Sequence, residues 1–151
     1  MNTKRIQPKD VDGYLALKDL AQALCDEPNN VDGILVLCPK SDEPIFLVVC
    51  TSQNFQGVDN DALGGRILEV IRFSDNLVIS HENFNPGNIK SIVYEFDDLV
   101  FVVYKVRGDN LQDVYLVLVN TKDKDLGAFN ANRGRVRAQM EVAIKRMGLL
   151  N

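Results

Sequence analysis

Residues 88–107 read "NIKSIVYEFDDLVFVVYKVR", two apolar runs separated by a pair of aspartates. Runs rich in Val, Ile, Tyr and Phe favour strands, and two residues between them are enough for a tight hairpin. The stretch therefore predicts strands at 88–96 and 99–107. A third run, "VYLVLVN" at 114–120, follows a turn-rich "GDNLQD" segment and predicts a further strand beside them.

A second hairpin is expected upstream. The runs "GILVLC" (33–38) and "IFLVVC" (45–50) flank a loop that contains proline and aspartate. Their apolarity is nearly continuous, which is typical of strands covered on both faces. We therefore expect this hairpin to lie centrally in the sheet rather than at its edge.

Three helices are predicted from apolar residues that recur at spacings of three and four. The first spans 9–26, the second 61–80 and the third 128–148. The apolar face of the first helix holds Val11, Tyr14, Leu17, Ala21 and Leu24, and that of the third holds Phe129, Val136, Met140, Ala143, Ile144 and Met147. The order α-β-β-α-β-β-β-α predicts an α+β fold, a five-stranded antiparallel sheet with helical layers on both faces.

The middle helix has more apolar surface than one sheet can cover. One stripe is predicted to face the sheet: Leu63, Ile67, Val70, Ile71, Ser74, Leu77 and Val78. Phe73 falls on one flank of this stripe, while Leu68 and Ile79 fall on the other, in line with Gly64. Two adjacent glycines cost a helix about 2 kcal/mol relative to alanine, so they indicate either close approach of another backbone or a frayed helix start.

Composition places limits on the class of protein. The 151 residues suit one domain, and no apolar run approaches the ~20 residues needed to cross a membrane. The N-terminus lacks the apolar core of a secretory signal, so a cytoplasmic protein is expected. The net charge of −4 argues against a general nucleic-acid binder, although residues 122–151 carry seven Lys/Arg against three Asp/Glu.

The cysteines are predicted to be buried free thiols. Cys25, Cys38 and Cys50 are odd in number and contain no C-x-x-C pair. In the upstream hairpin Cys38 should lie opposite Ile45, and Cys50 opposite Asp32, so these two are not expected to be neighbours. A disulfide needs Cα atoms within about 7 Å.

We find no constellation for catalysis or for binding a metal or cofactor. His81 is the only histidine and has no partner motif for zinc. The carboxylate pairs at 42–43, 59–61 and 97–98 fall in expected turns or caps. Neither G-x-x-x-x-G-K-[ST] nor G-x-G-x-x-G occurs. The strand aromatics resemble an RNA-stacking platform without its basic residues, which favours packing instead.

These elements together resemble a Roadblock/dynein-light-chain domain. The resemblance rests on "VDG" (31–33) opening the first strand, on "SIVYEFDDLVFVVYKV", and on "DLG" (125–127) between the last strand and an amphipathic helix. It implies an N-terminal extension at 1–9 and a Roadblock-like domain over 10–151. It also implies a non-enzymatic scaffold or regulatory module, a platform for Ras-like GTPases, a dynein adaptor, or a bacterial polarity and motility regulator.

The resemblance further implies a dimer, either with an identical chain or with a paralogous Roadblock-like chain. In the family, the middle helices pack together and the third strands pair edge to edge. That places the dimer interface on Gly64, Leu68, Phe73, Ile79, Ile92 and Tyr94.

The start of the last helix, "NANRGRVR", is more basic than the family pattern. We interpret Arg133, Arg135 and Arg137 either as contacts for an acidic partner or membrane surface, or as solvated helix charges.

Two other functions stay open on the residues alone. A PAS-like or profilin-like ligand-sensing domain would need an internal pocket, and an enzyme would need His81.

Overall fold

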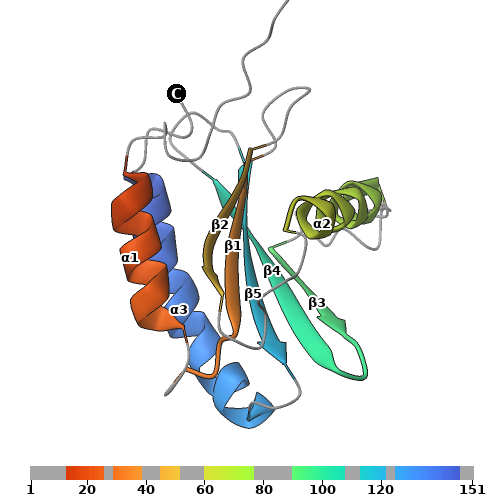
Figure 1. Ribbon diagram of the computed structural model, residues 1–151. Helices are drawn as coiled ribbons and strands as arrows, with labels where there is room; N and C mark the ends of the chain where they lie inside the picture. Colours follow the sequence, from red (N-terminus) through yellow and green to blue (C-terminus); the bar gives the residue numbers. More distant parts are fainter. Residues whose placement is uncertain are drawn as a thin grey trace, which may run out of the picture.

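A computed structural model describes residues 13–25, 29–38, 45–51, 60–76, 90–107, 113–121 and 125–146. A five-stranded antiparallel sheet has the strand order β2-β1-β5-β4-β3 (Figure 1). The elements in chain order are α1 (Tyr14–Leu24), β1 (Gly33–Cys38), β2 (Ile45–Thr51), α2 (Asn60–Asn76), β3 (Ser91–Glu95), β4 (Leu99–Arg107), β5 (Asp113–Thr121) and α3 (Leu126–Lys145).

The predicted fold class needs correction in the arrangement of its strands. The first hairpin was expected to be central, but β2 is an outer strand and β5 is the middle one. β5 pairs with β1 on one side and with β4 on the other. The apolar composition of a strand reports that its faces are covered, which also happens at a sheet edge when a helix packs there. Here α1 packs on β2.

The sheet has a helical layer on each side, as Figure 1 shows, with α1 and α3 side by side on one face and α2 on the other. The larger core lies under α1 and α3, and it contains Leu17, Phe129, Met140 and Ile144 together with alternate residues of β1, β4 and β5. The smaller core lies under α2 and contains Leu35, Leu37, Val103, Val117 and Val119 from the sheet. Alternation along the strands sends neighbouring residues to opposite cores.

The face of α2 that meets the sheet differs from the predicted stripe. Ile67, Leu68 and Ile71 are buried, whereas Val70 is 38% exposed. The predicted stripe contained seven residues, and its centre lay to one side of the face of α2 that contacts the sheet. A helix that rests on a sheet through a narrower line buries only positions i, i+3, i+4 and i+7, and here Gly64 begins that line.

The last helix begins two residues earlier than predicted, because Asp125 caps its first turn. The Asp125 carboxylate accepts hydrogen bonds from the backbone N–H groups of Gly127, at 2.9 Å, and Ala128, at 3.3 Å. The predicted apolar face is confirmed at Phe129, Val136, Met140 and Ile144, all fully buried. The predicted end of this helix, at residue 148, lies outside the described residues.

Buried polar groups join the segment before β1 to the end of β5. The Asp32 carboxylate, which is fully buried, accepts hydrogen bonds from the Thr121 backbone N–H and hydroxyl, both at 2.7 Å. The Asn120 side-chain amide donates to the Asn30 carbonyl oxygen at 2.9 Å. Buried polar groups require such partners, so this network fixes how β1 and β5 meet.

The prediction of free thiols is wrong at Cys25, which is disulfide-bonded. Cys25 lies at the end of α1, outside the hairpin that holds the other two cysteines, so the spacing of the hairpin cysteines says nothing about its pairing. Among the described residues, no helix is both long and apolar enough to cross a membrane.

Candidate functional site

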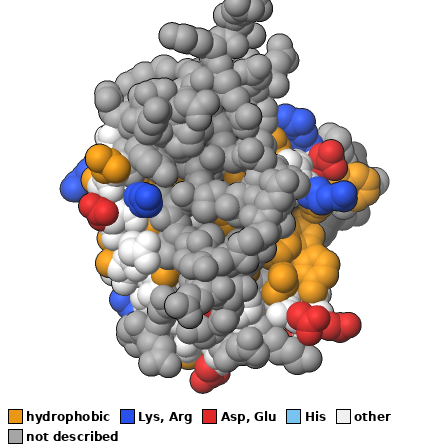
Figure 2. Space-filling model, viewed as in Figure 1, with side chains coloured by type: hydrophobic (Ala, Val, Ile, Leu, Met, Phe, Trp, Pro, Cys, Tyr) orange, Lys and Arg blue, Asp and Glu red, His pale blue; other side chains and the backbone are white. Residues whose placement is uncertain are grey.

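Apolar side chains gather on β3 and β4, on the same face of the sheet as α2. Tyr94 and Phe101 are cross-strand partners with ring centroids 6.0 Å apart, and the ring of Phe96 lies 5.3 Å from that of Phe101. Phe96 is 56% exposed, and Ile92, Tyr94 and Phe101 are half-buried. Figure 2 shows this hydrophobic surface beside α2. We call Ile92, Tyr94, Phe96 and Phe101 the aromatic strip.

The outer side of α2 adds a second exposed apolar position. Phe73 is 64% exposed and lies on the side of the helix that faces away from the sheet, opposite Ile67, Leu68 and Ile71. Phe73 on α2 and Phe96 beside β3 are thus both exposed apolar positions that a partner could cover.

The six expected interface residues divide into three groups. Phe73, Ile92 and Tyr94 reach the surface. Leu68 is buried in the core between α2 and the sheet of the same chain, and Gly64 is also buried. Ile79 lies outside the described residues. The helical wheel placed Leu68 correctly relative to Gly64, but it could not tell which side of the helix met the sheet.

The edge of β3 completes this surface. Among the described strands, β3 pairs only with β4 and ends the sheet. No described strand pairs with its far side, and proteins usually cover or block an edge of this kind. The acidic turn after β3, with Asp97 and Asp98, is exposed at one end of that edge.

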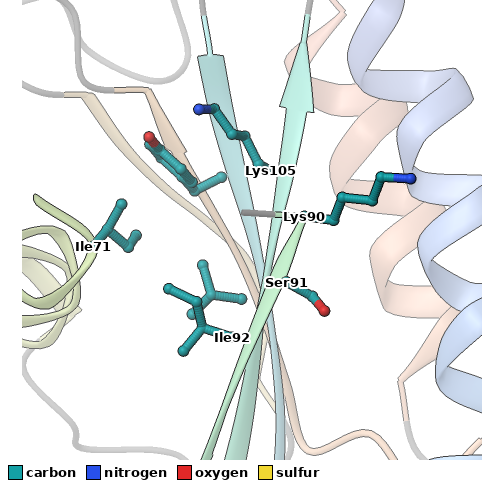
Figure 3. A pocket seen from close by; sticks show the side chains of 7 residues that line it. Ile71, Lys90, Ser91, Ile92 and Lys105 are labelled. Carbon is teal, nitrogen blue, oxygen red and sulfur yellow. The ribbon is translucent and has the colours of Figure 1, made fainter. Parts of the chain in front are cut away.

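A small recess lies between α2, β3, β4 and β5. Figure 3 shows Ile71 and Ile92 pointing toward each other across it, whereas Lys90 and Ser91 point to the opposite side of the sheet. The recess has a volume of about 10 Å³, room for about one water molecule. This recess is therefore too small for the ligand that a sensing domain would bind.

The three arginines of α3 all contact residues of their own chain. Arg133 donates to the Tyr104 hydroxyl at 2.6 Å, and the guanidinium carbons of Arg133 and Arg137 lie 5.9 and 5.5 Å from the Tyr104 ring centroid. Arg137 pairs with Glu141 at 3.2 Å. Arg135 donates to the side-chain oxygen of Asn29.

These contacts fix the arginines without using all their donors. A guanidinium has five N–H groups, and stacking on a ring leaves its edge open to a carboxylate or phosphate. Tyr104 and Asn29 were not predicted as part of this group, since they lie 29 and 106 residues from their arginines in sequence. Separations of that length give no local signal for such pairs.

The described residues contain no group of three or more His, Cys, Asp or Glu side chains placed to hold a metal ion. Asp97 and Asp98 lie in the turn between β3 and β4, as predicted. His81 lies outside the described residues.

Comparison with known proteins gives a result for the fold. No family model and no curated protein sequence matches the chain. Its structure is similar to the gliding protein MglB of Thermus thermophilus, with a TM-score of 0.65 and 14% identity over 89% of this chain and 90% of that one. A structure described as MglB with tetrameric arrangement gives a TM-score of 0.66 at 13% identity, over 87% and 90% of the two chains.

Myxococcus xanthus MglB is also similar, with a TM-score of 0.59 and 11% identity over 87% of this chain and 93% of the other. The chain has a Roadblock-like fold. Identities this low establish the fold alone. The Roadblock-like fold agrees with the resemblance seen in the sequence.

Proposed function

We propose that the protein is a non-enzymatic regulatory or scaffold module that dimerises and binds a small Ras-like GTPase. The observation that carries this proposal is a set of exposed apolar positions, Phe73 on the outer side of α2 and the aromatic strip on the sheet, beside β3, which has no second strand partner among the described strands. The Roadblock-like fold supports it, because the sequence resemblance implies GTPase platforms and motility regulators. The structural similarity to the gliding protein MglB supports the same proposal.

In the proposed dimer, two copies meet about a two-fold axis beside α2 and β3. Phe73, Ile92 and Tyr94 form the contact surface, with Phe96 at its border. Leu68 would contribute indirectly, because it packs α2 on the sheet of its own chain, and Gly64 is buried as well. A two-fold axis lets the β3 edges pair antiparallel, which satisfies the backbone groups that one chain leaves open.

The GTPase is proposed to contact the arginines of α3, on the other side of the sheet. Arg133 and Arg137 are held against Tyr104, and Arg135 is held by Asn29, so little side-chain entropy remains to be lost when an acidic partner binds. Residues 122–151 carry a net positive charge, whereas the rest of the chain is acidic. This positive charge would steer an acidic surface toward α3.

Sedimentation velocity of the full chain at micromolar concentration tests the dimer. We expect a species of twice the 16.9 kDa chain mass. A chain that stays monomeric at tens of micromolar while retaining its circular dichroism spectrum would contradict the proposed interface. A dimer that fails to bind any GTPase would leave the interface intact and overturn the proposed function alone.

A further inference from the structure

Cys25 is the residue that follows α1 and caps its end. Its backbone N–H donates to the Ala21 carbonyl oxygen at 2.9 Å, and the residue is only 4% exposed. It belongs to the core cluster that also contains Leu24 and Ile34. Cys25 is disulfide-bonded, and the chain has only two other cysteines, at positions 38 and 50.

The backbone geometry distinguishes between these two positions. Residue 50 of β2 is paired with Ile34, near the start of β1, whereas residue 38 is paired with Ile45 at the far end of the same hairpin. The chain passes from Cys25 to the start of β1 in eight residues, and Figure 1 shows α1 ending at the side of the sheet where β1 begins. Residue 38 lies four residues beyond Ile34, or about 13 Å along the strand.

We propose that Cys25 and Cys50 form a disulfide that fastens the end of α1 to the outer strand β2, and that Cys38 is the free thiol. Disulfides require Cα atoms within about 7 Å, and the register places position 50 beside the start of β1, where α1 ends, and position 38 at the far end of the hairpin. The packing of α1 on β2 agrees with this pairing. The sequence predicted three free thiols, so the clamp is a modification site that the chain does not reveal without its fold.

The bond forms by thiol–disulfide exchange with a low-molecular-weight disulfide such as glutathione disulfide. The thiolate of one cysteine attacks the oxidant and releases one glutathione thiol, giving a mixed disulfide. The second protein thiolate then displaces the second glutathione and closes the Cys25–Cys50 bond. Two protein thiols are oxidised and one glutathione disulfide is reduced to two thiols.

The Cys25–Cys50 disulfide is expected to stabilise the folded chain. It closes a loop of about 26 residues, which restricts the unfolded chain and stabilises the folded one. It also secures α1 over β2, one of the two outer strands of the sheet. The proposed dimer surface lies on the opposite face, at β3, so oxidation of this pair and dimerisation are predicted to be independent.

Peptide mapping identifies the pair directly. Cleavage before aspartates places the cysteines on separate peptides, 19–25, 32–41 and 42–58. The protein is incubated with glutathione disulfide, alkylated without reduction, and digested. We expect peptide 19–25 linked to 42–58 and a single alkylated cysteine, on 32–41. Three alkylated cysteines, or a link from 19–25 to 32–41, would overturn the proposal.

Thermal unfolding with and without a phosphine reductant gives a second test. Each variant is compared with itself in the two conditions, so a loss of stability caused by the substitution itself cancels. The oxidised wild type and Cys38→Ala should lose about 5–10 °C of melting temperature on reduction. Cys25→Ala and Cys50→Ala should show no difference between the two conditions. A reductant effect that persists in Cys50→Ala, or vanishes in Cys38→Ala, would assign the bond to the other pair.

Discussion

Phe73 is the residue on which the proposed dimer depends most, and its replacement by glutamate is expected to separate the two chains. About 130 Å² of a roughly 200 Å² phenylalanine side chain is solvent-exposed in one chain, given its 64% exposure. Burying that area against a partner is worth about 3 kcal/mol per chain at 25 cal/mol per Å². A two-fold dimer contains the contact twice.

Only part of that energy appears as affinity, because association also costs rotational and translational freedom. Glutamate adds the penalty of placing a carboxylate in an apolar contact, with its copy from the other chain nearby. We therefore expect the dissociation constant to rise at least a hundredfold, which corresponds to about 2.7 kcal/mol. Sedimentation equilibrium over a range of concentrations measures this change.

The same substitution should leave the single chain folded, since surface changes away from caps and cores usually alter stability by less than about 0.5 kcal/mol. Leu15→Glu is the matched control. Leu15 is 72% exposed on α1, on the other side of the sheet, so its replacement should leave the dimer unchanged. Equal dimer affinities for Phe73→Glu, Leu15→Glu and the wild type would refute the proposed interface.

Three further substitutions test other parts of the structure. Asp32→Ala should lower the free energy of unfolding by about 2–4 kcal/mol in urea titrations, because it leaves two partly buried Thr121 donors without their acceptor; an unchanged midpoint would show that the network does not hold β1 to β5. Gly134→Ala should raise stability by about 1 kcal/mol, since a Cβ there meets no atom within 4 Å, and a loss of stability would contradict that geometry. Arg133→Glu combined with Arg137→Glu should abolish GTPase binding while the dimer persists in sedimentation; intact binding would assign these arginines to the fold alone.

Much of the local structure could be predicted from the sequence because its signals are local. The strands at 91–95 and 99–107 follow from their composition, and the buried face of α3 follows from the spacing of Phe129, Val136 and Met140. These patterns depend only on residues within a few turns of one another.

The remaining features depend on contacts between distant segments. The order of the strands places β5 between the two hairpins, and no property of the first hairpin reveals that β2 lies outside. The rotation of α2 depends on which residues the sheet presents to it. For the same reason Val70 was predicted on the buried face and is partly exposed.

The candidate surface was predicted in part. Excess apolar residues on the middle helix suggested a contact surface there, and the family resemblance added the strand at 88–96; Phe73 and Tyr94 do reach the surface. The aromatic residues of these strands were predicted to pack, and Phe96 does contact Phe101, yet it is 56% exposed. The partners of the arginines and of Cys25 lie far away along the chain, so neither could be inferred from spacing.

Capture of a small GTPase from the native cell tests the central proposal most directly. The tagged full chain and its Arg133→Glu, Arg137→Glu variant would be used as bait, with GTP analogue or GDP present throughout, and the bound proteins would be identified by mass spectrometry. The proposed function predicts that one Ras-like GTPase is enriched on the wild type, in one nucleotide state more than the other, and is lost from the variant. A wild-type dimer that enriches no Ras-like GTPase in either nucleotide state would contradict it.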